Sequence, residues 1–265
     1  MLRFLPLALL LAACEPSPPA PPAPSPPPPP TAPVDAEAQA VVDAALAAHG
    51  ARILEDADVT FGFRGARFEL STHPGTWSIR RIAQDEEGRE VEDALGADGL
   101  VHRENGADVP LSPAEAAATE SGVNSVAYFA LLPYKLNDPA ARKRLLAPAT
   151  IGGRQYDVVE VTFDEQGGGA DWEDRFVYWF DARRHTLDYL AYAFAVNGGG
   201  TRFREATNPR TVGGVRVQDY RNYTADSTGA PFQRLERYPE LLGTDRLRLL
   251  STVALDSVRV VPGAE

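Results

Sequence analysis

The stretch Phe176-Val177-Tyr178-Trp179-Phe180 decides the fold, because it is apolar at every position. In a β-strand, successive side chains point to opposite faces of the sheet. Phe176, Tyr178 and Phe180 therefore share one face, and Val177 and Trp179 share the other. An antiparallel sheet usually leaves one face in water, so a strand of this composition needs a cover on both faces. One cover is the protein core, and the other is a helix or an apolar ligand.

The segment Leu187–Val196, which follows after a short turn, has the same property. Its two faces hold Leu190, Tyr192, Phe194 and Val196 on one side, and Leu187, Tyr189 and three alanines on the other. Two neighbouring strands that are both apolar on both faces strengthen the expectation of a sheet covered on each side.

Further short strands are predicted on both sides of this pair. Between Asp58 and His102, apolar and polar residues alternate, and Gly-containing turns separate the strands. The turns are predicted at Pro74-Gly75, Glu87-Gly88 and Asn105-Gly106, of which the last is a strong hairpin signal. After residue 150, strands are predicted at Arg154–Phe163, Arg175–Asp181, Thr186–Val196, Val215–Thr224, Pro231–Tyr238 and Thr252–Val261. The pattern is that of an antiparallel meander.

Two helices interrupt the strands. The first is predicted over Val34–His49, with an apolar stripe along one face, Gly50 as its stop and His49 as a C-terminal capping residue. The second is predicted over Ser112–Leu132. Its start has the Ser/Glu spacing of a capping box with Pro at the first helical position, and Pro133 ends it. A short helical turn is predicted over Pro139–Leu146.

The N-terminus resembles a bacterial lipoprotein signal. Arg3 precedes an apolar run, and Leu11-Ala12-Ala13-Cys14 follows it, in the order expected for such signals. The resemblance implies that residues 1–13 are removed, that Cys14 is lipidated and that the domain is held at a membrane. The alternative is an ordinary secretory signal with an incidental cysteine. Glu15 after the cysteine favours the outer membrane by the same resemblance, and the expected placement faces the periplasm.

The segment 14–33 is dominated by proline, which favours an extended tether without packed structure. Residues 34–265 are expected to form one domain. Cys14 is the single cysteine, so no disulfide stabilises the fold and an apolar core must do so. The net charge is −11, which disfavours nucleic acid as a partner. The apolar runs beyond the signal are too short to span a bilayer.

Three features resemble a known family of proteins. They are the run Tyr128–Pro139, the segment Gly152–Phe163 and the strand Tyr178–Asp181. Together with the element order they resemble an uncharacterised family of bacterial lipoproteins related to the outer-membrane lipoprotein carriers, LolA and LolB. The similarity runs from Val34 to about Val261. The implied fold is mostly β with α (α+β), a curved antiparallel half-barrel covered on its concave face by helices. In the carriers that concavity binds acyl chains, and no catalytic residue is implied.

A set of aromatic residues is the candidate lining of a ligand pocket. The alternative is that these rings are simply packed core, although tyrosines often lie at a wet rim because a buried hydroxyl needs a partner. The set is Trp77, Phe129, Tyr134, Tyr178, Phe180, Tyr189, Tyr192 and Phe194.

Other chemistry finds less support in the sequence. Among the histidines, His73 and His102 could meet across strands, but no metal-binding spacing is present, and no cofactor is expected. The acidic residues around Gly167-Gly168-Gly169, Asp171 among them, favour a solvated hairpin end over a calcium loop. The stretch Asn197–Thr201 lacks the Lys of a phosphate loop and predicts a plain turn.

Three functions stay open on this basis. The leading hypothesis is a membrane-anchored lipoprotein that binds or transports an apolar ligand, a lipid or a lipoprotein acyl chain, without catalysis. The second is a hydrolase that uses paired carboxylates, which requires two acids facing each other across a polar cleft. The third is a scaffold lipoprotein that docks a protein partner of the cell envelope.

Overall fold

A computed structural model of the chain describes residues 35–167, 172–194, 199–225 and 234–263. The predicted signal peptide, Cys14 and the proline-rich tether lie outside the described residues, as do Asp171 and part of the Asn197–Thr201 turn. Chain contacts separate Met1–Pro33 from Val34–Glu265. Both sheets and all of the apolar clusters described below lie in the second unit.

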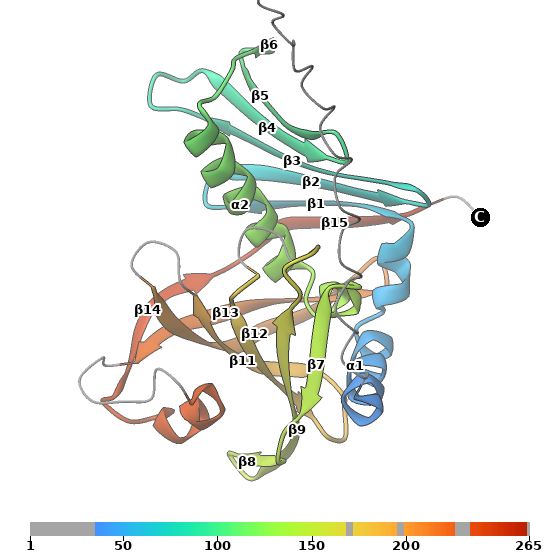
Figure 1. The fold of residues 1–265 in the computed structure, drawn as a ribbon, viewed down its shortest axis with the longest axis vertical. Helices are drawn as coiled ribbons and strands as arrows, with labels where there is room; N and C mark the ends of the chain where they lie inside the picture. Colours follow the sequence, from blue (N-terminus) through green and yellow to red (C-terminus); the bar gives the residue numbers. More distant parts are fainter. Residues whose placement is uncertain (1–34, 168–171, 195–198, 226–233, 264–265) are drawn as a thin grey trace, which may run out of the picture. The chain divides into compact units, whose positions relative to one another are not determined.

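The first sheet has seven strands in the order β15-β1-β2-β3-β4-β5-β6, all antiparallel (Figure 1). Along β1 and β2 alternate residues are buried, as the alternating sequence predicts. The strands are β1 Ala57–Phe63, β2 Ala66–His73, β3 Thr76–Gln84, β4 Glu90–Gly96, β5 Gly99–Glu104, β6 Ala107–Asp108 and β15 Asp256–Pro262.

Opposite charges alternate across the exposed face of this sheet. Arg80 on β3 pairs with Glu69 on β2 at 2.6 Å and with Glu92 on β4 at 3.1 Å. Arg103 on β5 pairs with the same Glu92 at 2.9 Å. This polar face is in water, so the apolar face with Phe61 and Phe68 is the one that packs against the rest of the domain.

The second sheet has eight strands, in the order β14-β13-β12-β11-β10-β9-β7 with β8 paired to β9. The two segments that are apolar on both faces form neighbouring strands, with Tyr178 opposite Leu190. The strands are β7 Ala141–Leu145, β8 Ala149–Ile151, β9 Arg154–Phe163, β10 Arg175–Asp181, β11 Leu187–Phe194, β12 Gly200–Val212, β13 Val215–Ala225 and β14 Leu247–Val253.

The helix α1, Ala36–Ala48, covers part of the second sheet. Asp35 caps it by accepting a hydrogen bond from the Ala38 N–H at 3.0 Å, and the same carboxylate accepts one from the Leu145 N–H at 2.8 Å. These two hydrogen bonds attach the start of α1 to β7. His49 is the C-cap, as predicted, and Gly50 follows in the left-handed conformation at φ 67°. The 3-10 helix η1, Ala51–Glu55, leads from there to β1.

The helix α2, Pro113–Ala130, crosses the apolar face of the first sheet above β3 and β4 (Figure 1). Ser112 and Glu115 form the predicted capping box. Val123, Ala127 and Leu131 pack into an apolar cluster with strand residues of the first sheet and with Val215 and Val217 of β13. The 3-10 helix η2, Tyr134–Asn137, follows α2. None of the described helices has the length and apolarity needed to cross a bilayer.

The second face of the second sheet is covered by the 3-10 helix η4, Leu235–Leu241. Leu235, Tyr238 and Leu241 pack there against Trp179 and Phe203. The prediction that β10 is covered on both faces is therefore correct, and the chain itself supplies both covers. The predicted fold class, α+β with curved antiparallel strands covered by helices, is confirmed, with the strands divided between two sheets.

Four predictions of local structure are wrong. Pro139–Leu146 is not a helical turn, because residues 141–145 form β7 and satisfy their backbone groups on the edge of β9. The described part of Pro231–Tyr238 belongs to the helix η4 instead of a strand, since its apolar residues recur every third position. Thr252–Val261 divides at Ala254-Leu255 into β14 and β15, which belong to different sheets. The fourth is an omission, because no strand was predicted over Gly200–Val212, which forms β12.

Candidate functional site

An aromatic layer lies on the face of the second sheet that is turned toward α1 and the end of α2, hereafter the inner face. Phe176, Tyr178 and Tyr192 of the sheet stack on one another, with ring centroids 6.0 Å apart for the first pair and 5.4 Å for Phe176 and Tyr192. Phe129 of α2 packs over Tyr192 at 5.1 Å. The end of α2 therefore covers the strand aromatics with an aromatic side chain of its own.

A hydrogen bond between the partly buried Tyr128 and the buried Tyr178 attaches α2 to this layer. The hydroxyl oxygens of Tyr128 and Tyr178 are 2.6 Å apart. Burial raises the pKa of both phenols, so both stay protonated, and each hydroxyl needs a partner. The pair satisfies that need inside the core and holds the last turn of α2 against β10.

Arg204 of β12 is a buried cation within the aromatic layer. The residue is 8% exposed. Its guanidinium carbon lies 3.8 Å from the ring centroid of Phe129 and 5.3 Å from that of Tyr192, and one terminal nitrogen donates to the Tyr192 hydroxyl at 3.0 Å. Among the described residues no carboxylate pairs with it, and its Nε has no hydrogen-bond acceptor. Aromatic faces stabilise the cation in part, but a buried charge normally has a counter-charge.

A second unsatisfied polar atom lies on the neighbouring strand. Asn222 of β13 is the direct partner of Arg204 in the register of the two strands. Its amide nitrogen donates to Ser251 at 3.2 Å, while its Oδ1 has no donor among the described residues. A buried donor and a buried acceptor on paired residues are the groups that the polar end of a ligand would satisfy.

The structure brings together four of the eight predicted ligand-binding residues. Phe129, Tyr178, Phe180 and Tyr192 meet on the inner face. Phe194 continues the layer toward the end of β11, 6.0 Å from Tyr192. Whether these rings contact a ligand stays a prediction.

The other three predicted residues lie elsewhere. Tyr189 is on the opposite face of the sheet, stacked on Phe203 at 5.7 Å. Tyr134 follows α2 and borders a small pocket of about 10 Å³ beside His49. Trp77 lies at the start of β3 and is 43% exposed. Tyr189 and Tyr192 are three positions apart in the same strand, so their side chains point to opposite faces of the sheet. The sequence alone predicts this difference.

Sequence reasoning missed the polar part of this site. Arg202 and Arg204 alternate with Phe203 in β12, a pattern that usually indicates a polar face in water. No signal in the sequence distinguishes the buried Arg204 from an exposed arginine. Tyr128 lay within the run Tyr128–Pro139 that carries the family resemblance, but it was not included in the candidate set.

His73 and His102 pair with different aspartates. His73 lies 2.5 Å from Asp56, and the hydrogen bond between them raises the pKa of the imidazole. His102 lies 2.7 Å from Asp93, which also pairs with Arg81 at 2.8 Å. Within the described ranges, no group of three or more His, Cys, Asp or Glu side chains could hold a metal ion.

The buried His49 has a structural role, because it accepts a backbone hydrogen bond. The Leu187 N–H donates to its Nε2 at 3.1 Å, so its ring is neutral with the proton on Nδ1. Burial, aided by the charge of Arg216, lowers the pKa of His49 to about 3.

The two glutamates of the surface cleft, Glu236 and Glu240, do not have the raised pKa that a general acid needs. Glu236 and Glu240 of η4 are at a surface cleft, where each pairs with an arginine. Burial opposes ionisation of Glu236, but hydrogen bonds to the backbone and to Arg234 outweigh it and lower its pKa. The hydrogen bond from Arg237 lowers the pKa of Glu240. A general acid requires a raised pKa, so this pair does not favour the hydrolase hypothesis.

Comparison with known proteins gives a family and a set of similar structures. The model of a family of unknown function, DUF6503, matches residues 68–254. No curated protein matches the chain. A LolA superfamily protein from Nitrosomonas europaea is 12% identical with a TM-score of 0.44, covering 72% of this chain and 87% of that one.

Two further structures resemble the chain to a similar degree. A DUF1329 family protein from Desulfovibrio piger is 11% identical with a TM-score of 0.42, covering 86% of this chain and 95% of that one. A putative outer membrane lipoprotein-sorting protein domain from Vibrio parahaemolyticus is 13% identical with a TM-score of 0.38, covering 76% and 97%. The family model confirms the predicted membership of an uncharacterised family, and the relation to the LolA carriers stays a resemblance. Because the family model matches more than half of the sequence, the chain belongs to the DUF6503 family.

Proposed function

We propose that this protein is a lipoprotein of the bacterial cell envelope that binds an apolar ligand, a lipid or an acyl chain, without catalysis. The ligand would lie between α2 and the inner face of the second sheet, with its chain among Phe129, Phe176 and Tyr192. The single observation that carries the proposal is the buried guanidinium of Arg204, which has no carboxylate partner among the described residues.

The position of Arg204 indicates how such a ligand would be oriented. A fatty acid or phospholipid has one anionic end and an apolar remainder. Its anionic end would satisfy the Nε of Arg204 and be stabilised by the charge, because hydrogen bonds that involve an ionised group are stronger than neutral ones. A hydroxyl or ammonium group of a phospholipid headgroup would donate to the Oδ1 of Asn222, which the anionic group itself cannot do.

The helix α2 is suited to be a movable cover. Its N-terminal half has mainly small side chains, and the three that are not fully exposed, Ala116, Thr119 and Ser121, are only partly buried. Gly122 lies in the middle of the helix, and a glycine there lowers helix stability by about 0.5–1 kcal/mol relative to alanine. Entry of a ligand requires Phe129 to move away from Arg204, and a weakened helix lowers the free energy of that movement.

The proposed location follows from the N-terminal sequence. Residues 1–13 would be the signal, Cys14 the lipidated residue, residues 15–33 the tether and residues 34–265 the ligand-binding domain. Lipid on Cys14 would hold the protein at the outer membrane, facing the periplasm. Multiple acyl chains make such an anchor stable.

The test uses residues 34–265, produced without lipid attachment. Native mass spectrometry would detect a co-purified lipid, and a fluorescent fatty-acid probe would measure affinity. We expect probe binding that Arg204→Met weakens at least tenfold. The control Arg221→Met removes an exposed arginine of β13 that pairs with Glu205 at 3.2 Å and should leave binding unchanged. Absence of lipid and of probe binding in the unsubstituted domain would refute the proposal.

A further inference from the structure

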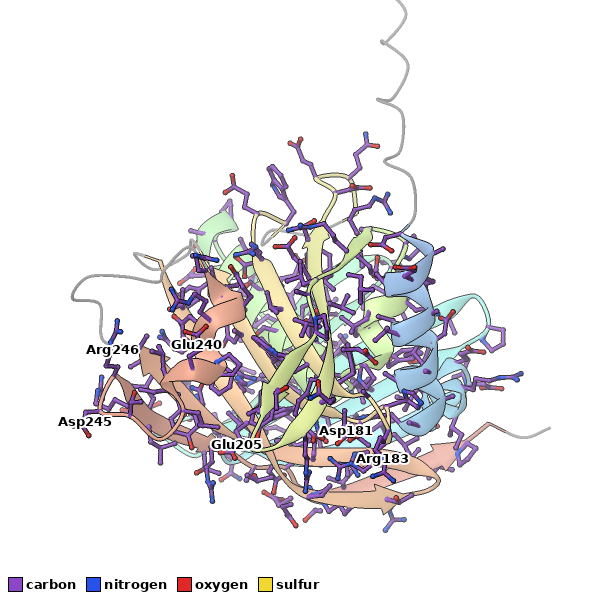
Figure 2. The ribbon with its side chains drawn as sticks, turned by 90° about the horizontal axis from the view of Figure 1, so that it is seen from below. Asp181, Arg183, Glu205, Glu240, Asp245 and Arg246 are labelled. Carbon is purple, nitrogen blue, oxygen red and sulfur yellow. The ribbon has the colours of Figure 1, made fainter. Side chains whose placement is uncertain are left out.

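A surface cleft of about 580 Å³ lies on the outer face of the second sheet, the face opposite α1. One side is formed by Arg144 of β7 and by the segment Leu146–Ala149, and the other by η4. Val158 and Trp179 of the sheet lie between them. Figure 2 shows Glu240 on η4, at the border of this cleft, well separated from Asp181 and Arg183 in the turn between β10 and β11. The volume is within the range of small-molecule sites.

The cleft has an excess of positive charge. Four arginines line it, namely Arg144, Arg175, Arg234 and Arg237, against the two glutamates of η4. Arg144 and Arg175 both pair with Glu160 of β9. Arg234 and Arg237 pair with the glutamates of η4, so each arginine of the cleft has a carboxylate partner, and arginines outnumber acids among the lining residues.

The excess charge is accessible at the rim. The side chains of Arg144 and Arg234 are each 64% exposed, and in the described part of the chain Arg144 pairs with Glu160 and Arg234 with Glu236. Because a guanidinium has five N–H donors in a planar arrangement, each can bind a further anionic group while it keeps its present partner. The protein as a whole carries a net charge of −11, so a local excess of positive charge is unusual for its surface.

The wall of the cleft is apolar and contains an unsatisfied donor. Leu146, Ala147, Pro148, Ala149 and Val158 contribute aliphatic surface. Trp179 is fully buried, and its indole N–H has no acceptor among the described residues. A buried N–H without a partner destabilises the protein, and an oxygen of a bound molecule would remove that destabilisation.

We infer that this cleft binds a small amphiphile, a molecule with one carboxylate or phosphate group and a compact apolar body. The anionic group would lie between Arg144 and Arg234, and the apolar body against Pro148 and Val158. The site is distinct from the inner face, because Val177 and Trp179 alternate along β10 with the residues of the aromatic layer. A sheet thus separates the cleft from Arg204.

Trp179 supplies a direct reporter of occupancy. The chain has three tryptophans, and the other two, Trp77 and Trp172, are 43% and 36% exposed. The variant Trp77→Phe/Trp172→Phe of residues 34–265 therefore emits from Trp179 alone, and substitution of two exposed side chains is expected to leave the fold intact. Decanoate, decanol and inorganic phosphate, titrated separately below any micelle concentration, distinguish the amphiphile from its parts.

We expect decanoate to change the Trp179 emission saturably, decanol to bind at least tenfold more weakly, and phosphate alone to have no saturable effect. Arg144→Gln and Arg234→Gln should each weaken decanoate binding about tenfold. Arg67→Gln is the matched control, because Arg67 is 61% exposed and pairs with one glutamate at 2.6 Å on the first sheet. Unchanged thermal unfolding would show that each variant is folded.

The remaining outcomes overturn the inference. Absence of a saturable decanoate signal would exclude the site, and equal binding of phosphate would show an anion site without recognition of the apolar body. Loss of the Trp179 signal in Arg204→Met would place the decanoate on the inner face instead. Retention of the signal in Arg204→Met, together with its loss in Arg144→Gln, supports the cleft whether or not the inner face binds a lipid.

Discussion

The guanidinium of Arg204 lies 3.8 Å from the ring centroid of Phe129. A buried cation of β12 is therefore covered by an aromatic side chain of α2, and the movement of one exposes the other. In the described part of the chain this cation has no carboxylate partner, so it is stabilised mainly by aromatic faces and by one tyrosine hydroxyl.

The first prediction separates stability from binding at Arg204. Replacement of a buried charge by an apolar side chain of similar size is often neutral or stabilises a protein by about 1–4 kcal/mol. Arg204→Met should therefore leave the free energy of unfolding unchanged or raise it, while it lowers the affinity for an anionic lipid at least tenfold. Urea unfolding and probe titration of the same preparation measure the two effects. A variant that loses about 3 kcal/mol of stability would instead show a purely structural arginine.

The two-faced strand β10 shows how far the sequence could predict this fold. The alternation of Tyr178 and Trp179 correctly indicated covers on both faces, because the apolar character of successive residues is a local property. The identity of the outer cover was not predictable in the same way. The apolar residues of η4 recur only three times, at Leu235, Tyr238 and Leu241, which is too short a pattern to distinguish a helix from a strand.

The site was predictable in its apolar part only. Aromatic residues mark the inner face, but the burial of Arg204 depends on Phe129, which lies 75 positions earlier in the chain and in another element. The strand β7 was missed for a related reason. Its Arg-Lys-Arg centre has no strand signal, and it is held as a strand by the hydrogen-bonding groups of β9.

The second prediction concerns the stability of the proposed cover. An added Cβ at Gly122 meets no heavy atom within 4 Å, so Gly122→Ala should stabilise α2 by about 0.5–1 kcal/mol through helix propensity alone. If α2 must open for a ligand, the same substitution should slow probe uptake measured by stopped flow. Gly106→Ala is the control, because its Cβ also meets nothing while φ is +79°. It should destabilise the hairpin and leave the rate of uptake unchanged.

The third prediction concerns the anchor. Cys14 is the single thiol of the chain, so it is the one available site for a thioether to diacylglycerol. Cells that express the full chain and are fed an alkyne-labelled fatty acid should give a labelled protein, and Cys14→Ser should abolish the label and release the protein from the membrane fraction. A label that persists in Cys14→Ser would exclude lipidation at this residue. A secreted, unlabelled wild-type protein would indicate an ordinary secretory signal.

The fourth prediction is a pH dependence caused by His49. Its pKa is lowered to about 3 in the folded protein by burial and by Arg216, whereas an unfolded chain has a histidine pKa of about 6.5. Between these values the unfolded state binds more protons than the folded state. The stabilising contribution of the neutral ring is therefore complete above about pH 6.5 and decreases as the pH falls toward 3. The limiting slope is about 1.4 kcal/mol per pH unit.

His49→Gln isolates this effect, because an amide oxygen can accept the hydrogen bond from the Leu187 N–H but does not titrate. The variant should be less stable than the wild type at pH 7.5, since the fit of the imidazole is lost, and its thermal midpoint should fall less steeply between pH 6.5 and 4.5. His185→Gln, in the turn between β10 and β11, is the control that should keep the wild-type slope. That window lies above the range in which carboxylates with lowered pKa values, such as Asp35 and Glu92, lose their contribution. Equal slopes in wild type and His49→Gln would show that His49 does not set the acid sensitivity of the fold.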